Sequence, residues 1–234
     1  CSVQFAARFV RGPASRTCYR SSEDHRGYDA FDVQSQGEPP PFIDHRPQGS
    51  TMNKGCVLAV SGTPGTGKTS ACAFLAGLGW KVLSLADLAG EHGCLEAVDA
   101  MDGAAPIDIH RLADAWEAPK QGRYLVDGHL AHFLDVDGIV LLRCPPSTLR
   151  ARLLQREYSE AKIRANVEWE MTSGHWAELL EFDIERPVAE FDTASLTVEA
   201  LGEAIDAWSN DGLPASDLRH QASEAIDWLG ESLN

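Results

Sequence analysis

One octapeptide, residues 62–69, constrains the fold of this chain more than any other segment. It reads GTPGTGKT and fits the pattern G-x-x-x-x-G-K-[ST]. The glycines let the backbone curl until successive N–H groups point at phosphate oxygens. The lysine adds a cation for the outer phosphates, and the threonine hydroxyl can bind Mg²⁺. The octapeptide therefore predicts a triphosphate-binding loop, which requires a strand before it and a helix after it.

The flanking segments meet this requirement. Residues 56–61 read CVLAVS, a short apolar run typical of a buried parallel strand, and residues 69–78 are compatible with a helix. The alternative is a glycine-rich turn that matches the pattern by chance. The correct order of strand, loop and helix makes that interpretation the weaker one.

The charge of the chain is strongly negative and unevenly distributed. The formal net charge is −15, from 35 acidic and 20 basic residues. Residues 1–51 hold six Arg and six Asp or Glu, so the whole excess, 29 acidic against 14 basic residues, lies in residues 52–234. Such a surface disfavours nonspecific DNA binding. Adaptation to high salt and ordinary acidic solubility both remain open as its cause.

Hydropathy and cysteine usage indicate the cellular compartment. No stretch of 18 apolar residues occurs, so the sequence predicts no membrane span. The six cysteines are scattered and form no C-x-x-C pair. We therefore expect reduced thiols in a cytoplasmic protein.

The first 51 residues differ from the rest of the chain. They begin with Cys, lack a sustained apolar period, and contain the proline-rich run GEPPP at residues 37–41. This composition predicts a disordered or extended segment. Met52 stands four residues before the first expected strand, so we expect Met52 to be the natural start and residues 1–51 to be a translated upstream segment or a flexible extension. A native N-terminus well before Met52, found by mass spectrometry, would contradict this hypothesis.

From Met52 onward, expected strands and helices alternate. Helical apolar spacing predicts helices over 109–116, 146–156, 160–180 and 198–208. Short apolar runs predict strands over 56–61, 81–85, 123–127, 138–143 and 188–192. Alternation of this kind predicts an α/β protein of the P-loop NTPase class, with a five-stranded parallel doubly wound sheet.

The segment VDGH at residues 126–129 follows the third expected strand. Asp127 is suited to hold a Mg²⁺-bound water, and Gly128 lets the chain turn close to the phosphates. His129 is suited to orient a water or a phosphoryl oxygen. The alternatives are an Asp that caps the next helix and a surface His.

Cations gather after the fourth expected strand, although the chain has only five lysines. Residues 150–164 contain Arg150, Arg152, Arg156 and Arg164, and Arg152 and Arg156 share a helix face at a spacing of four. Phosphoryl transfer needs cations near the transferred group, often on a mobile segment that closes over it. Arginines on an ordinary solvated helix are the alternative.

The connection between the second and third expected strands, about residues 87–108, is acidic and rich in glycine. Kinases that act on small phosphate acceptors hold the acceptor in this connection. An acidic pocket is an unusual host for a phosphate group. A plain crossover loop and helix is the alternative.

Taken together, these motifs resemble the adenylate kinase isoenzyme six family in its archaeal form. The resemblance runs from about residue 53 to the C-terminus and includes residues 225–229, which read AIDWL. Its motifs are the octapeptide, the VDGH segment, and residues 156–163, which read REYSEAKI and precede Asn166 and Glu170.

The resemblance implies a nucleoside monophosphate kinase fold with a lid, adenylate kinase activity and ATPase activity. It further implies assistance to small ribosomal subunit maturation, through ribosomal protein uS11 and the small-subunit pre-rRNA. On this basis residues 52–234 would form one kinase-like domain. The monophosphate-binding region would lie at about 87–108 and the lid at about 155–166.

The resemblance also assigns site residues. Asp127 and His129 match the family's strand-end motif, and Arg156 matches the start of its lid. The family's Arg-Gly-Tyr is here Arg156-Glu157-Tyr158, which removes backbone freedom and adds a negative charge beside ATP. The residues expected to bind ATP are Gly65, Thr66, Gly67, Lys68, Thr69, Ser70 and Arg156.

We therefore expect Mg²⁺-dependent transfer of the γ-phosphoryl group from ATP to AMP, with slow ATP hydrolysis. Lys68 would stabilise the transferred group, Thr69 and Asp127 would organise Mg²⁺, Arg156 would neutralise developing charge, and His129 would position water or phosphate. One alternative is an ATP-switched assembly factor that binds uS11 and has incidental kinase activity. Another is a kinase for a different small metabolite.

Overall fold

The computed structural model describes residues 55–97 and 105–230. The expectations about residues 1–51 and Met52 lie outside the described residues, as does the middle of the connection expected to bind a monophosphate. None of the described helices is long and apolar enough to cross a membrane.

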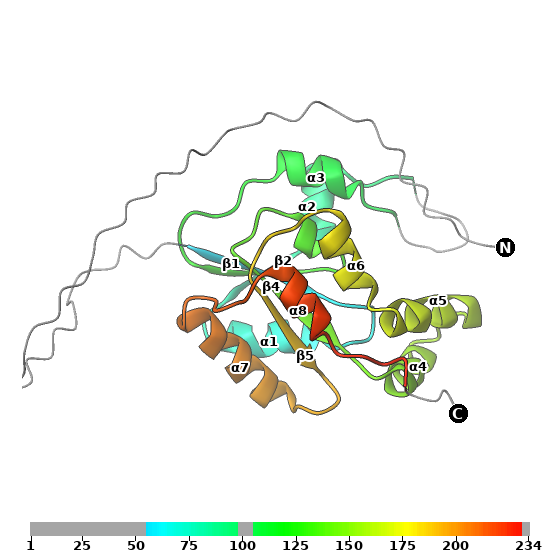
Figure 1. Cartoon of the computed structure of the whole chain (residues 1–234). Coiled ribbons are helices and arrows are strands. Elements are labelled where there is room, and N and C mark those ends of the chain that lie inside the picture. Colours follow the sequence, from blue (N-terminus) through cyan, green and yellow to red (C-terminus); the bar gives the residue numbers. More distant parts are fainter. Residues whose placement is uncertain (1–54, 98–104, 231–234) are drawn as a thin grey trace, which may run out of the picture. The chain divides into compact units, whose positions relative to one another are not determined.

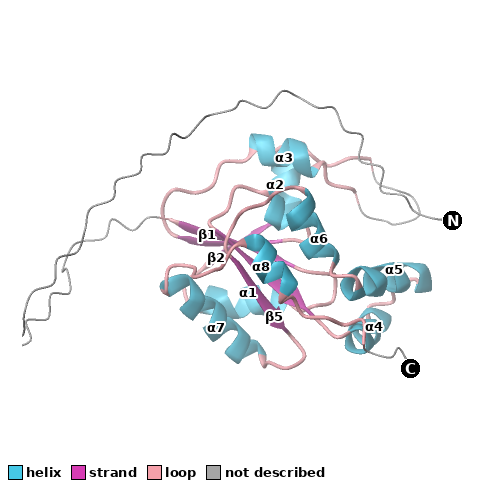
Figure 2. Ribbon diagram, in the orientation of Figure 1, coloured by secondary structure: helices cyan, strands magenta, loops and turns pink. Residues whose placement is uncertain are grey.

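A five-stranded, fully parallel sheet forms the centre of the described domain (Figure 2). Its strand order is β2-β3-β1-β4-β5, so chain order and spatial order differ, as crossover connections require. The strands are β1 (Cys56–Ser61), β2 (Lys81–Ser84), β3 (Arg123–Asp127), β4 (Gly138–Arg143) and β5 (Val188–Asp192).

Helices cover both faces of this sheet (Figure 1). One face carries α1 and α7, and the other carries α2, α3 and α6. The expected fold class, an α/β doubly wound P-loop domain, is thereby confirmed. The helical elements are α1 (Lys68–Gly77), α2 (Leu85–Glu91), α3 (Ile109–Ala115), η1 (Ala131–Phe133), α4 (Pro146–Gln155), α5 (Glu160–Met171), α6 (Gly174–Glu181), α7 (Val198–Asn210) and α8 (Leu218–Ser223).

The central strands are apolar on both sides because both of their faces are covered. All six residues of β4 are buried, and so are the last five of β1. Alternate residues along β1 enter different cores: Val57 and Ala59 pack with α2, α3 and α6, whereas Leu58 and Val60 pack with α1 and α7.

The prediction of a single helix over residues 160–180 is wrong in one respect. This segment is two helices, α5 and α6, because Ser173 takes a left-handed backbone with φ of 52°. Gly174 follows, and a Cβ there would lie 2.2 Å from the indole ring of Trp169. Apolar spacing continues through the break, so the sequence pattern hides it.

The predicted second strand also ends one residue early, at Ser84. The Ser84 hydroxyl accepts a hydrogen bond from the Asp87 backbone N–H and so caps α2. This short helix, with η1 and α8, was not predicted, because each is too short to show a clear apolar period.

Candidate functional site

Parallel pairing brings the loop and the VDGH segment to the same sheet edge. Val60 lies opposite Asp127 in the register of β1 and β3. The Gly128 N–H also donates to the Val60 carbonyl at 3.3 Å. Two segments more than 60 residues apart in the sequence therefore meet where both strands end.

The octapeptide forms a tight turn between β1 and α1. Gly62 has a φ of 143°, and a Cβ there would lie 2.4 Å from the Leu142 carbonyl oxygen. Gly67 has a φ of 101° and precedes α1 without a side-chain cap. The first N–H groups of α1 therefore face the loop with no capping side chain, as an anion-binding helix N-terminus requires.

Lys68 folds its side chain back over the loop. Its Nζ donates to the carbonyls of Gly62 at 2.6 Å and Thr63 at 3.1 Å. The pKa of Lys68 is lowered to about 8, mainly because the ammonium is buried; Asp127 opposes this lowering, and Arg156 adds to it. The ammonium therefore lies within the loop, where Asp127 and Arg156 are close enough to affect its pKa.

This lowered pKa predicts a pH dependence of nucleotide binding. Because Lys68 is protonated below pH about 8 and neutral above it, the affinity for ATP should fall as the pH rises through about 8. An ordinary lysine would stay charged to about pH 10. Titration with a non-hydrolysable ATP analogue across this range measures the effect. Lys68→Arg, which keeps its charge, should give a flatter profile. A flat profile for the unchanged protein would contradict the prediction.

A hydroxyl and a carboxylate meet beside Lys68. Thr69 Oγ1 donates to Asp127 Oδ2 at 3.1 Å, and Thr69 is exposed. Hard oxygen donors at an open edge fit Mg²⁺, which retains several water and phosphate ligands. In the described part of the chain, no group of three or more His, Cys, Asp or Glu side chains is arranged to hold a metal. Thr69 and Asp127 together would supply two oxygen ligands to a magnesium ion here.

The two arginines predicted to share a helix face lie at different distances from the loop. Arg152 in α4 donates from Nη1 to the Gly65 carbonyl at 3.3 Å and to Thr193 Oγ1 at 3.4 Å. Arg156 is exposed at the C-cap of α4 and lies close enough to Lys68 to affect its pKa. Arg152 thus contacts the loop directly, whereas Arg156 borders it from solvent.

Glu157, the departure from the family's Arg-Gly-Tyr, takes the backbone that glycine prefers. Its φ is 58°, directly after the C-cap of α4. Because a left-handed backbone costs a non-glycine residue about 1 kcal/mol, Glu157→Gly should raise the free energy of unfolding by about that amount. Urea denaturation measures this change. Glu168→Gly, within α5, should destabilise by a similar amount, and a destabilising Glu157→Gly would contradict the prediction.

His129 is half-buried. Its Nδ1 lies 3.3 Å from the Gly62 carbonyl and 3.1 Å from His175 Nε2. Burial lowers the pKa of His129, and the nearby Lys68 lowers it further. Its ring therefore favours the neutral form beside the loop.

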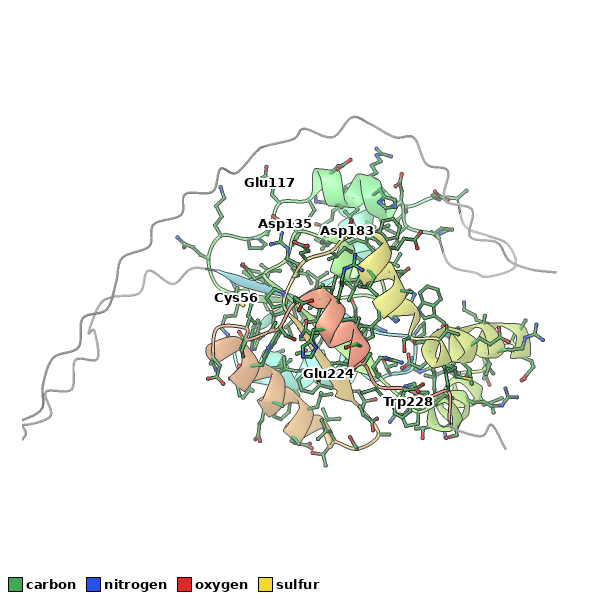
Figure 3. All side chains as sticks on the ribbon, viewed as in Figure 1. Cys56, Glu117, Asp135, Asp183, Glu224 and Trp228 are labelled. Carbon is green, nitrogen blue, oxygen red and sulfur yellow. The ribbon has the colours of Figure 1, made fainter. Side chains whose placement is uncertain are left out.

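A buried ion pair between Arg143 and Glu170 contacts the loop through Thr63. Arg143 at the end of β4 donates to Glu170 of α5 at 2.6 Å and to Glu190 of β5 at 2.6 Å. Glu170 also accepts from the Thr63 hydroxyl at 2.5 Å. Trp228, labelled in Figure 3, donates its indole N–H to Glu170 at 3.4 Å. The Glu170 carboxylate thus joins the loop, the end of β4 and the C-terminal segment, and Arg143 extends the network to β5.

Sequence reasoning did not predict these roles of Thr63, Arg143, Glu170 and His175. Glu170 appeared only as part of the family resemblance. An acidic residue on a helix normally faces solvent, and no local pattern distinguishes it from Glu168. The pairing of Arg143 with Glu170 depends on the fold.

The connection expected to hold a monophosphate is only partly described. Asp87 lies in the first turn of α2, and Leu95 pairs with Ile107 in an isolated antiparallel bridge. A separate hollow of about 450 Å³ lies between α3, η1 and the segment after α6. Asp135, labelled with Asp183 in Figure 3, borders it and pairs with Arg186 at 2.6 Å. Its acidic rim is unfavourable for an anionic acceptor.

Comparison with known proteins shows the family to which this chain belongs. A family model described as an AAA domain matches residues 58–172. A protein of Archaeoglobus fulgidus named "Putative adenylate kinase" is 38% identical over 175 residues, which cover 75% of this chain and 93% of that protein. This chain belongs to the same family. A protein of Pyrococcus abyssi with the same name is 37% identical over 174 residues, covering 74% of this chain and 91% of its own length.

A third member of this adenylate kinase family, from Halobacterium salinarum, is 37% identical over 151 residues. It covers 64% of this chain and 88% of its own length. Among solved structures, TT1252 from Thermus thermophilus matches 69% of this chain with a TM-score of 0.39 and 17% identity, covering all of its own length. A deoxyadenosine kinase from M. mycoides with bound dATP matches 65% of this chain and 98% of its own, with a TM-score of 0.40 and 16% identity.

Proposed function

We propose that this protein is a Mg²⁺-dependent nucleoside monophosphate kinase that transfers the γ-phosphoryl group of ATP to AMP and also hydrolyses ATP slowly. The observation that carries the proposal is the meeting of three groups at one sheet edge. These are the glycine-rich loop with Lys68, the pair formed by Thr69 and Asp127, and Arg152 of α4, with Arg156 at the C-cap of that helix. Membership of a family whose relatives carry the name adenylate kinase supports the choice of reaction.

Each residue has a defined task in this proposal. The backbone N–H groups of residues 65–70 hold the phosphates, and Lys68 exchanges its two carbonyl partners for phosphate oxygens. Thr69 and Asp127 would hold Mg²⁺, which would neutralise negative charge on the phosphates when bound. Arg156 neutralises charge that develops on the transferred group, and His129 orients a water or phosphoryl oxygen.

The proposal also assigns moving parts. Residues of about 155–166, from the end of α4 into the first half of α5, act as the lid, and residues of about 87–108 act as the monophosphate-binding region. Left-handed backbone at Glu157 supports a hinge at the start of this lid, because a helix ends and a new direction begins there. Closure would carry Arg156 toward the phosphates and exclude water.

A coupled assay of ADP production with and without AMP tests the reaction. We expect ADP formation from ATP to increase strongly on addition of AMP, with two ADP formed per AMP consumed. GMP, CMP and UMP in parallel reactions define the preferred acceptor. AMP-independent turnover alone would contradict the kinase proposal, and consumption of ATP with another small acceptor would favour a different metabolite kinase.

A second candidate function is an ATP-switched factor for small ribosomal subunit assembly, which binds ribosomal protein uS11 and small-subunit pre-rRNA. The observation that favours it is the excess of 29 acidic over 14 basic residues in residues 52–234, which suits a basic protein partner. A pull-down with purified uS11, in ATP and in ADP, tests it. Nucleotide-dependent binding without AMP-stimulated ADP production would favour this candidate over the kinase.

A further inference from the structure

Three aromatic side chains form a hydrogen-bonded chain that leads to the loop. Trp169 donates its indole N–H to His175 Nδ1 at 3.2 Å. His175 Nε2 lies 3.1 Å from His129 Nδ1, with the two rings nearly perpendicular at 88°. His175 is almost fully buried, 2% exposed, and Trp169 is half-buried. The proposed function gives no task to Trp169 or His175.

Donor chemistry sets the direction of this chain. An indole nitrogen can only donate, so His175 Nδ1 must accept. Burial, then His129 and His132, hold the pKa of His175 well below its usual value, so this ring is neutral. A neutral imidazole with an accepting Nδ1 carries its proton on Nε2. His175 therefore donates from Nε2, and His129 Nδ1 must accept.

The Gly62 carbonyl does not change this assignment. It lies 3.3 Å from His129 Nδ1 and accepts from Lys68 Nζ at 2.6 Å, so this carbonyl has a donor without a proton from His129. If His129 Nδ1 instead carried a proton for Gly62, His175 Nε2 would have to accept. His175 Nδ1 would then hold a proton that faces the indole N–H at 3.2 Å, which places two donors against each other.

The break between α5 and α6 builds this arrangement. Left-handed Ser173 turns the chain so that His175 meets Trp169, which lies two residues before the end of α5. Gly174 allows the indole to lie against the backbone, because a Cβ at this position would overlap the ring. A continuous helix would separate the side chains of Trp169 and His175. The hydrogen bond between them therefore requires the break between α5 and α6.

We propose that Trp169 and His175 are positioning residues that hold His129 as the tautomer with its proton on Nε2, so that His129 donates from Nε2 to a phosphate oxygen. Within residues 55–97 and 105–230, the hydrogen bonds of His129 all fall on Nδ1, which leaves Nε2 available to a ligand. The opposite tautomer would present a lone pair to the phosphate and repel it. This inference rests on the proposed function of the same site.

Long-range ¹H–¹⁵N spectra of the nucleotide-free full chain, labelled at histidine, report the tautomer of each ring. We expect His129 to be protonated on Nε2. Trp169→Phe keeps an aromatic ring but removes the indole N–H, and His175→Leu removes the imidazole that links Trp169 to His129. In both variants His129 should show mixed tautomers. His175→Gln keeps a donor at the position of Nε2 and should restore the Nε2–H form. Trp208→Phe is the control, because it removes the indole N–H of a tryptophan in α7 that donates to the Pro214 carbonyl and not to a histidine.

Turnover measurements connect the tautomer to the reaction. Trp169→Phe and His175→Leu should lower kcat about tenfold, the size of one lost hydrogen bond to a charged group, while His175→Gln and Trp208→Phe stay within about twofold. Circular dichroism and the unfolding midpoint show whether each variant is folded.

Three results would overturn the inference: His129 protonated on Nδ1 in the unchanged protein, an unaltered tautomer in both Trp169→Phe and His175→Leu, or an altered tautomer with unchanged kcat. A failure of the proposed function is recognised separately. If the proposed function fails, the protein without substitutions will show no AMP-dependent turnover. The spectra need no nucleotide, so they will still show which residues set the tautomer of His129.

Discussion

Lys68→Ala is expected to abolish both ATP hydrolysis and AMP-dependent ADP production while the fold stays intact. The Nζ of Lys68 is the cation that the loop holds in place before a phosphate arrives, through the carbonyls of Gly62 and Thr63. Loss of one preorganised group of this kind costs a rate factor of about 10² to 10³. Steady-state turnover with and without AMP measures the effect.

Lys120→Ala is the matched control for this variant. Lys120 is exposed, and only its backbone carbonyl takes part in the described structure, by accepting from the Gly55 N–H. Its removal changes the net charge equally and should leave turnover unchanged. Unchanged ATP turnover in Lys68→Ala would show that the octapeptide is not the site, and loss of the folded state in that variant would require a comparison with Lys68→Arg.

Glu170→Ala should give the largest loss of stability. Glu170 is 1% exposed and accepts from Arg143, the Thr63 hydroxyl, the Cys144 N–H and Trp228. Its removal leaves the buried Arg143 guanidinium with Glu190 as its remaining carboxylate partner among the described residues. Breaking a buried ion pair in this way costs about 3–5 kcal/mol. Urea denaturation followed by circular dichroism measures the free energy of unfolding.

Glu168→Ala provides the comparison within the same helix. Glu168 lies two residues earlier in α5, is 67% exposed, and pairs with Arg164 at 3.8 Å. Such exposed pairs contribute little, so its free energy of unfolding should remain unchanged within error. Equal effects of the two substitutions would mean that the buried network around Arg143 is not a source of stability.

Glu170→Ala should also weaken ATP binding in whatever fraction remains folded. The Thr63 hydroxyl loses its partner, and Thr63 lies inside the loop with its side chain completely buried. A buried hydroxyl without a partner costs about 1–3 kcal/mol, and the loop can relieve this cost only by moving. The loop geometry therefore depends on a helix more than 100 residues later in the chain.

The strands and the loop could be predicted because their signals are local. Buried parallel strands read as short apolar runs, and the bounds predicted for four of the five strands match the structure. The octapeptide predicted its own turn, because glycines and a helix start must stand at fixed positions within it. The remaining one, β2, differs only at Leu85, where the Ser84 cap begins α2.

The ends of the helices and the supporting residues could not be predicted in this way. Apolar spacing runs through Ser173, although the helix stops there. Trp169 and Glu170 are adjacent in the sequence, yet one leads to His129 and the other to Arg143. Which of two neighbouring helical residues faces which partner depends on how α5 lies on the sheet.

The sequence by itself determined the class of fold and the phosphate loop, because both follow from the spacing of residue types over a few positions. Only the tertiary structure decided which distant groups complete the site. Hydrogen bonds such as those between Thr63 and Glu170 and between His175 and His129 require a few ångströms of separation. Contacts of that range between segments far apart in the chain exist only after the sheet, the helices and the turn at Ser173 have formed.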